Sequence, residues 1–527
     1  MPVQIRKLIF AVVAWLALIT AGAAAPPLNA AEQVVVRQFE HAGRLLQEGR
    51  PELAVDEYRR LADSYPNSDL ADDALLAIAA QRYAVSDLDG LGRSHGPGLE
   101  EVFRMYDRIR RDHGQGNAAP AAIVRMALLR LEPRAAGYAL EEARALFRSA
   151  IENYPASEWS DDARLGMAFC SRRTAEPARV VADLQPFSEA LAASPLAARA
   201  YLWRGDAFEA LGRRTRAVET YQALRDRLPR AAEAAWARGR ALLLMRRTLA
   251  ARGTARLAED GSYEAARFDG AREAPTITAS EQGSIYLANP GRGTISRLDA
   301  RGRLLEQKPA GKPALMGLDP FGRAVFVEGA TLRLGRQSWN LAAPEEGKTV
   351  PLRPAAAPVS RADGSWWIPD GSGGALLEFD RDLAFKRTVW SDSGASVSRS
   401  RAGADGTTWL LDTDSGRLVR LSAAGESRVI SLRANPADLR EPADLAVDPH
   451  GAVWVLDAGR ARVAVFSPAG EFEGSVALES AATGGAFQAL EVDSEGAFLV
   501  YDSRERRLRR FMEQAPAAAA GIAEVGR

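Results

Sequence analysis

Apolar residues in the first half of the chain recur with the period of an α-helix, in a pattern that appears three times. Each copy has a small residue, an aromatic residue on the next turn, a further small or apolar residue, and a proline that ends the helix. The members are Ala54, Tyr58, Leu61 and Pro66; Ala143, Phe147, Ala150 and Pro155; and Ala217, Tyr221, Leu224 and Pro229. A small residue lets two helices approach closely, and the aromatic ring fills the groove between them. The pattern predicts about four to five helical hairpins in an α-solenoid over residues 32–250.

After this helical region, short apolar runs alternate with turns that contain glycine, which is a strand pattern. The six turn glycines are Gly283, Gly322, Gly364, Gly406, Gly451 and Gly496. Each is followed by a continuous apolar run, as expected for a strand buried between two neighbouring sheets. One run per turn predicts a six-bladed β-propeller over residues 276–514, with a linker at 251–275 and a frayed tail at 515–527.

Closure of the propeller ring needs one more strand, because the last unit leaves no room for an outer strand before the Ala- and Pro-rich tail. A strand from earlier in the sequence would have to complete this unit. Residues 262–268 precede the first unit and alternate modestly, so we expect the closing strand there. This closure would join the helical domain stiffly to the propeller.

Two motifs in the helical half point to a known class of repeat. Tyr65-Pro66-Asn67-Ser68 is followed by paired aspartates at 72–73, and the motif that begins at Tyr154 is followed by paired aspartates at 161–162. A further unit, 198–231, spans about one tetratricopeptide period of 34 residues. This half resembles the tetratricopeptide-repeat domains of bacterial envelope proteins, including outer-membrane assembly lipoproteins and cell-division coordinators. The resemblance implies a superhelix that binds other proteins.

The propeller half contains a second family motif, clearest around Gly451. Asp448 precedes this turn glycine, Asp457 follows the apolar strand, and residues 462–466 form an Arg-Val-x-x-Phe strand. The pattern resembles NHL-repeat propellers, and it recurs less fully at 405–421 and 493–511. The chain therefore resembles a tetratricopeptide domain fused to an NHL-like six-bladed propeller.

The amino-terminal segment has the layout of a secretory signal peptide. A basic pair at 6–7 precedes an apolar run at 8–21 and small residues at 23–25. We expect residues 1–31 to be removed and the mature protein to be periplasmic or secreted, with an uncleaved amino-terminal anchor as the alternative. No cysteine near the cleavage region could carry a lipid, and the single cysteine, Cys170, is expected to be a buried hydrophobe.

Charge and residue content argue against several kinds of chemistry. The chain has 68 basic and 68 acidic side chains, so no nucleic-acid partner is implied. Its 4 histidines are too few for a histidine-rich metal site, and His450 is expected at the surface of a turn. We assign no catalytic, cofactor or metal-binding residue and expect no enzymatic activity. The residues that bind partners stay unassigned.

Three sets of polar residues recur in the propeller half. Aspartates near the turn glycines are expected to accept backbone N–H groups of those turns: Asp319, Asp363, Asp405, Asp448 and Asp493. A second set follows the apolar strands and could line one propeller face, as a calcium-dependent hydrolase would require: Asn289, Asp370, Asp412, Asp457 and Asp502, with Glu328 in the second unit. A basic cluster is expected at a solvated blade edge: Arg504, Arg506, Arg507, Arg509 and Arg510.

These features favour an exported protein–protein interaction scaffold. The tetratricopeptide groove and a propeller face would bind protein partners of a cell-envelope assembly or secretion complex. The alternative is binding of cell-wall material or polysaccharide by the propeller, with Trp366, Trp367 and Trp390 as candidates for stacking on sugar rings. A calcium-dependent propeller hydrolase is the third reading, and core packing is the other explanation for the tryptophans.

Overall fold

The computed structural model describes residues 30–85, 98–132, 139–260, 275–281, 283–311, 315–319, 322–334, 337–345, 348–371, 374–403, 405–434, 436–479 and 486–513. Contacts between Cα atoms divide the chain into two compact units, Met1–Cys170 and Ser171–Arg527. Most of the expected signal peptide, the segment 262–268 and the tail at 515–527 lie outside the described residues. No helix within the ranges given above combines the length and the apolar character that a membrane span requires.

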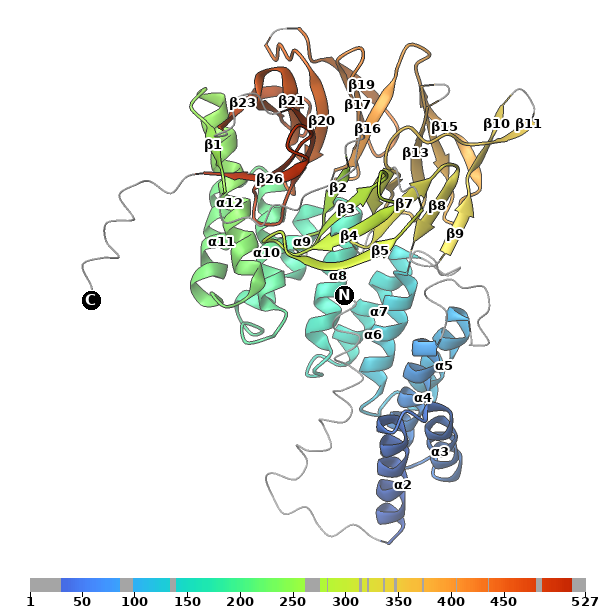
Figure 1. Ribbon diagram of the computed structural model, residues 1–527. Coiled ribbons are helices and arrows are strands. Elements are labelled where there is room, and N and C mark those ends of the chain that lie inside the picture. Colours follow the sequence, from blue (N-terminus) through green and yellow to red (C-terminus); the bar gives the residue numbers. More distant parts are fainter. Residues whose placement is uncertain are drawn as a thin grey trace. The chain divides into compact units, whose positions relative to one another are not determined.

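The first unit is a series of helices in which α2 to α7 each pack against the next (Figure 1). They are α2 (Ala30–Gln47), α3 (Pro51–Ser64), α4 (Ala71–Val85), α5 (Leu99–Asp112), α6 (Ala119–Arg130) and α7 (Leu140–Asn153), and α8 (Ser160–Arg173) crosses the unit boundary. The patterned residues of α3 and α7 are buried, and so is Cys170. A Cβ atom at Gly166 would lie 2.3 Å from the ring of Phe147. This confirms that a small residue allows close approach of an aromatic ring.

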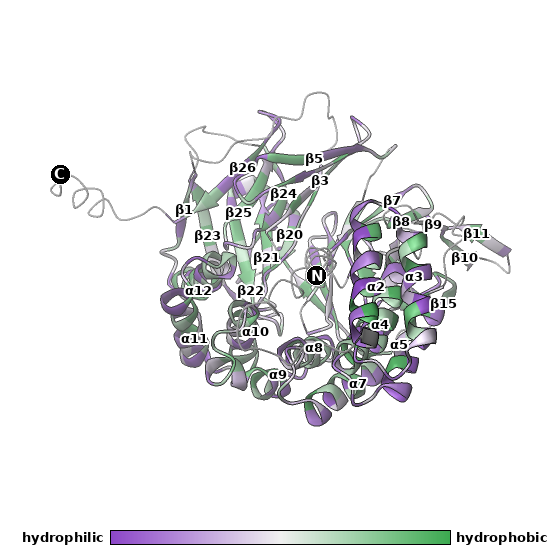
Figure 2. Cartoon of the chain, turned by 90° about the horizontal axis from the view of Figure 1, so that it is seen from below, coloured by the Kyte–Doolittle hydropathy of each residue, from purple (hydrophilic) through white to green (hydrophobic). Residues whose placement is uncertain are grey.

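The second unit begins with helices of the same kind. They are α9 (Pro177–Asp183), a 3-10 turn (Gln185–Ser188), α10 (Ala197–Ala210), α11 (Arg214–Arg227) and α12 (Ala232–Ala251). A Cβ atom at Gly205 on α10 would lie 2.2 Å from the ring of Tyr221 on α11. Helices α10 and α11 therefore repeat the packing of the first unit, as the sequence pattern predicts. In Figure 2 the helices carry both hydrophobic and hydrophilic residues, whereas β21 and β22 of the propeller are mostly hydrophobic.

The strands of the second unit form four sheets of four strands, one sheet of eight strands and one hairpin. The first two sheets are β2 (Thr276–Ala279), β3 (Ile285–Asn289), β4 (Thr294–Leu298), β5 (Leu304–Pro309); and β6 (Leu315–Leu318), β7 (Ala324–Glu328), β8 (Thr331–Leu334), β9 (Gln337–Asn340). The next two are β12 (Val359–Ser360), β13 (Trp366–Asp370), β14 (Ala375–Phe379), β15 (Phe385–Ser391); and β16 (Val397–Ala402), β17 (Thr408–Asp412), β18 (Arg417–Leu421), β19 (Ser427–Ser431). The hairpin is β10 (Ala342–Glu345) with β11 (Lys348–Pro351).

The eight-stranded sheet consists of two four-stranded units joined side by side. Its strands are β20 (Pro442–Val447), β21 (Val453–Asp457), β22 (Arg462–Phe466), β23 (Phe472–Glu479), β24 (Phe487–Val492), β25 (Phe498–Asp502), β26 (Arg507–Met512) and β1 (Arg256–Glu259). The first strands of successive units contact one another in the order β2, β6, β12, β16, β20 and β24, and β24 contacts β2. The described strands thus form a closed ring of six units, in agreement with the six turn glycines.

Strand β1 closes this ring. It pairs antiparallel with β26 and parallel with β23, so it occupies the outer-strand position for which we expected residues 262–268. Ion pairs hold it in place: Arg509 lies 2.6 Å from Glu259, and Arg510 lies 2.9 Å from Asp260. The expectation of a solvated arginine cluster is therefore wrong for these two arginines, which are buried, whereas Arg504 and Arg506 are exposed.

The turn glycines confirm the predicted hairpins between first and second strands, because all six have φ values between 74° and 84°. The nearby aspartates accept backbone N–H groups as expected, but they stand in two different registers. Asp448 and Asp493 lie three residues before their glycines. Each accepts hydrogen bonds from the backbone N–H groups of the residue before and the residue after the glycine. Asp363 and Asp405, directly before their glycines, bind the backbone and hydroxyl groups of Ser365 and Thr407. The five aspartates therefore do not share one blade position.

Helix α12 lies against the last two propeller units and is held there by buried arginines. The Arg246 guanidinium donates to both carboxylate oxygens of Glu513, at 2.8 and 2.9 Å, and Arg247 binds Glu473 in the same way, at 2.7 and 2.6 Å. His450, expected at the surface, is only 9% exposed. Its Nε2 lies 3.1 Å from the carbonyl oxygen of Arg240 on α12, so this nitrogen carries the proton. The turn packs against a helix that is distant in sequence, which explains its burial.

Gly239 permits a close approach of α12 to the propeller, and this predicts opposite effects for two glycine-to-alanine changes. A Cβ atom at Gly239 would lie 2.2 Å from the backbone of Glu495, whereas one at Gly43 on α2 would lie 3.7 Å from the Tyr58 hydroxyl. We expect Gly239→Ala to destabilise the protein by about 1–3 kcal/mol. Gly43→Ala, the control, should stabilise it by roughly 0.5–1 kcal/mol, because alanine favours a helix interior. Calorimetric unfolding of both variants tests this, and a native melting profile for Gly239→Ala would contradict the close packing.

Candidate functional site

The innermost strands of the propeller carry charged residues that face the centre of the ring. Arg399 and Arg401 alternate along β16, so they lie on the same face of that strand. The Arg399 Nε lies 3.3 Å from Asp444 Oδ1 on β20, and the Arg401 Nε lies 3.6 Å from Glu491 Oε2 on β24. Asp444 also accepts a hydrogen bond from the backbone nitrogen of Leu490, at 2.9 Å. These ion pairs link three neighbouring units at their inner edge.

Glu491 is the titratable member of this network whose protonation is most affected by its surroundings. Burial raises the pKa of its carboxyl group to about 7, and the positive charge of Arg401 acts in the opposite direction. The Arg401 Nε atom forms no hydrogen bond in this ion pair. The attraction between the two charges therefore offsets only part of the free energy that burial of the Glu491 carboxylate costs. Glu491 therefore gains and loses its proton near neutral pH.

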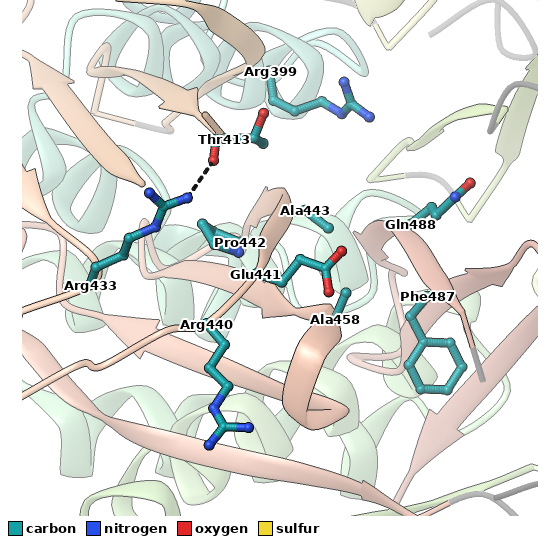
Figure 3. Close-up of a pocket in the computed structure, with 10 residues that line it drawn as sticks. All are labelled: Arg399, Thr413, Arg433, Arg440, Glu441, Pro442, Ala443, Ala458, Phe487 and Gln488. Carbon is teal, nitrogen blue, oxygen red and sulfur yellow. Dashed lines mark hydrogen bonds between the residues drawn. The ribbon is translucent and has the colours of Figure 1, made fainter. Parts of the chain in front are cut away.

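A cavity of about 590 Å³ opens beside this network, within the second unit. It is lined by Arg399, Thr413, Arg433, Arg440, Glu441, Pro442, Ala443, Ala458, Phe487 and Gln488. Five of these residues belong to the inner strands β16, β20 and β24, and three belong to the segment between β19 and β20. Thr413 and Ala458 belong to the turns that follow the second strands β17 and β21. Figure 3 shows the Glu441 carboxylate directed toward the middle of the group, with the Arg440 guanidinium pointing away from it. We call this cavity, with its ten lining residues, the arginine pocket.

The arginines of this pocket differ in how far protein groups already engage them. Arg399 donates to the Ser398 carbonyl at 2.8 Å and pairs with Asp444. Arg433 is exposed and donates to the carbonyl oxygen of Thr413 at 3.3 Å. The exposed Arg440 side chain makes no hydrogen bond or ion pair with any residue that the structure describes. The pocket thus has two guanidinium groups that form no ion pair with a carboxylate of the described chain, although Arg460 and, to a smaller extent, the charge of Arg440 lower the pKa of Asp438.

The wall that carries Arg440 and Glu441 is fixed by a buried aspartate. The Asp457 Oδ1 atom accepts the backbone N–H groups of both residues, at 3.1 and 3.0 Å. Its other oxygen binds the Nε of Arg462, at 3.0 Å. The backbone nitrogen of Ala458 also donates to the Glu441 carbonyl, at 2.9 Å. The loop is therefore held in place before any ligand arrives, which reduces the entropy lost on binding.

The residues expected to line a propeller face support the fold instead. Asp412, Asp457 and Asp502 are buried and bind arginines of the following strand, Arg417, Arg462 and Arg509, at 2.9, 3.0 and 2.8 Å. Asn289 accepts the backbone N–H of Arg292. Within the described part of the chain, no group of three or more His, Cys, Asp or Glu side chains is arranged to hold a metal ion.

The tryptophans proposed for sugar stacking are also largely inside the protein. Trp366 and Trp367 are 6% and 2% exposed, and they belong to two separate hydrophobic clusters. The Arg361 guanidinium covers the ring of Trp367 at 3.8 Å, and Trp390 is half-buried. Trp366 and Trp367 are therefore wrong as candidates for stacking on a sugar, because packing already covers their faces.

Family comparisons agree with this architecture. The family model for the tetratricopeptide repeat matches residues 41–68 and 199–231, and the model for the NHL repeat matches residues 439–466. The chain carries tetratricopeptide and NHL repeats. The NHL match spans β20 to β22, so it includes Arg440, Glu441 and the Asp457 that fixes them. No curated protein matches this chain.

Several solved structures are similar to about half of this chain. One is virginiamycin B lyase from Staphylococcus aureus, with 14% identity, a TM-score of 0.35, and 48% of this chain and 89% of that chain covered. Another is a gluconolactonase from Xanthomonas campestris, with 14% identity, a TM-score of 0.38, and 48% and 90% covered. A third is an auxiliary nutrient binding protein from Bacteroides thetaiotaomicron, with 12% identity, a TM-score of 0.36, and 49% and 75% covered. Similarity at this level assigns no activity to this chain.

The raised pKa of Glu491 predicts a specific pH dependence of stability. Between pH 4.5 and about 7 the folded state holds a proton that the unfolded chain releases, so stability falls as the pH rises through this window. Glu491→Gln should abolish this loss. Relative to the native protein, the variant should gain on the order of 2–3 kcal/mol between pH 4.5 and 8. Thermal unfolding of both proteins across this range measures the difference, and parallel pH profiles would contradict the assignment.

Proposed function

We propose that the protein is an exported interaction scaffold, in which the helical groove and one propeller face bind partners in a cell-envelope assembly or secretion complex. Tetratricopeptide and NHL repeats suggest a protein interaction scaffold, and both kinds of repeat are present. Repeat folds of this kind offer extended surfaces for recognition. The signal-like amino terminus supports export.

The observation that carries the proposal is the fastening of α12 to the propeller. The pairs of Arg246 with Glu513 and Arg247 with Glu473 are bidentate and mostly buried. Such pairs fix a relative orientation, because a small displacement would leave charges buried without partners. Helices α9 to α12 and the propeller thus form one compact unit that can hold two kinds of binding surface at a constant separation.

The alternatives have less support. Polysaccharide binding loses Trp366 and Trp367 as exposed stacking platforms, since both are in the core. A calcium-dependent hydrolase would use carboxylates that converge on a metal ion, but Asp412, Asp457 and Asp502 bind arginines and backbone groups of their own turns. The scaffold proposal explains both types of repeat, and it requires no function of these three aspartates beyond the structural contacts that they make.

Crosslinking in cells tests the scaffold. The full-length tagged protein is crosslinked, purified and analysed by mass spectrometry, and each crosslink is assigned to residues 32–250 or 276–514. We expect specific envelope proteins on both segments, because each segment carries repeats of a kind that offers a surface for recognition. Absence of any protein partner, or partners confined to one segment, would overturn the two-surface proposal.

Export is tested separately at the amino terminus. We expect the protein recovered from the periplasmic or secreted fraction to begin between residues 25 and 32, because small residues at the end of the apolar run suit signal cleavage. Mass spectrometry of the amino-terminal peptide measures this. Recovery of the uncleaved chain from the cytoplasm alone would contradict export.

A further inference from the structure

We propose that the arginine pocket binds an acidic peptide segment of a partner protein through the side-chain carboxylates of Asp or Glu residues. This inference rests on the proposed scaffold function, since it specifies the chemistry of one partner at the propeller face. The argument depends on the charges in the pocket, its apolar wall and the rigidity of its loops.

Two arginines of the pocket form no ion pair within the described chain, in contrast to four arginines on the third strands of the propeller. On the third strands, Arg417, Arg462, Arg509 and Arg510 all bind carboxylates of their own units, at distances between 2.8 and 3.0 Å. Arg433 and Arg440 line one cavity and form no ion pair with a carboxylate among the described residues. The exposed Arg440 guanidinium points away from the middle of the cavity, so its side chain turns inward when a ligand binds. A guanidinium binds a carboxylate through paired hydrogen bonds, so an acidic side chain is the ligand group that it fits best.

The other lining residues favour a peptide over a small anion. Pro442, Ala443, Ala458 and Phe487 form an apolar wall that suits a neighbouring hydrophobic side chain. Gln488 can donate and accept hydrogen bonds, and the Glu441 carboxylate can accept an N–H group of a peptide backbone. A cavity of about 590 Å³ is larger than one small anion requires. Arg399 belongs to β16, whereas Arg433 and Arg440 both lie in the segment between β19 and β20. Guanidinium groups from two segments suit more than one carboxylate along a peptide.

The arrangement of the pocket is preformed. Asp457 holds the backbone of Arg440 and Glu441, and Asp444 holds Arg399 from the side of the ring centre. Only the outer side chains must be ordered when a peptide binds, which keeps the entropic cost low. Because formal charge is balanced over the whole chain, the positive character is a local property of this site.

Selection from a peptide library tests the proposal with the full-length protein. Random peptides displayed on phage, joined to the coat protein at their carboxyl ends, are selected on the native protein and on the Arg433→Gln/Arg440→Gln variant. Arg301→Gln/Arg504→Gln is the matched control, because it removes the same charge from two exposed arginines outside the pocket. We expect the native and control proteins to enrich peptides that combine Asp or Glu with an apolar residue. The pocket variant should not enrich them.

Synthetic copies of the enriched peptides, amidated at the carboxyl end, then measure affinity by fluorescence anisotropy. We expect the pocket variant to bind them at least about tenfold more weakly than the native protein, and the affinity of the native protein to fall with added salt. No acidic enrichment, equal binding by the pocket variant, or binding only to peptides with a free carboxyl terminus would overturn the proposal. Equal affinity for an acidic polysaccharide would overturn the assignment of a peptide.

Failure of this inference is distinguishable from failure of the scaffold. Crosslinked partners on both segments, together with no selection of acidic peptides, would remove the role of the pocket and leave the scaffold intact. Absence of crosslinked partners would remove the scaffold itself. Unfolding of the pocket variant could also abolish peptide binding. Its melting profile is therefore compared with that of the control variant, and matching profiles show that the pocket variant is folded. Both variants change only exposed side chains.

Discussion

Closure of the propeller ring by β1 is the constraint on which the second unit depends. A ring of sheets is stable only when its last unit has an outer strand, because an unpaired edge leaves backbone groups without partners. Here that strand comes from the residues directly after α12, and it pairs with β26. Ring closure and attachment of the helices are therefore one structural event. Four residues of β1 cannot supply much hydrophobic burial, so Glu259 and Asp260 add ion pairs with arginines of β26.

Buried charges recur wherever the helices or successive units must keep a fixed orientation. Arg240 binds Asp206 between α12 and α10, Arg246 and Arg247 bind glutamates of the propeller, and Arg401 pairs with Glu491 at the ring centre. Burying such groups costs free energy that their mutual attraction repays only in good geometry. Their contribution is therefore to favour one arrangement over others more than to raise total stability. The apolar strands supply the main driving force for folding.

The sequence predicted the features that repeat along the chain. Small and aromatic positions identified the helical hairpins, and the turn glycines identified the six units, because each depends on local backbone geometry. Strand β1 was missed because its four residues show no distinctive alternation and pair with residues about 250 positions away. His450 was placed at the surface because its partner, Arg240, lies 210 positions earlier. The arginine pocket became visible only with the fold, since residues from three inner strands assemble it. The alternating arginines at 399 and 401 lie on the inner strand β16, but only Arg399 lines the pocket.

The order of β1 and β26 along the chain has a consequence for biosynthesis. The ribosome makes β1 before any other strand of the ring and β26 after all the others, so the two ends meet only when the whole domain has been synthesised. A chain interrupted anywhere before β26 would leave β1 with an open edge and the arginine partners of Glu259 and Asp260 missing. Such fragments would expose unpaired strands that proteases and chaperones recognise. Ring closure thus acts as a check that only chains translated through β26 pass.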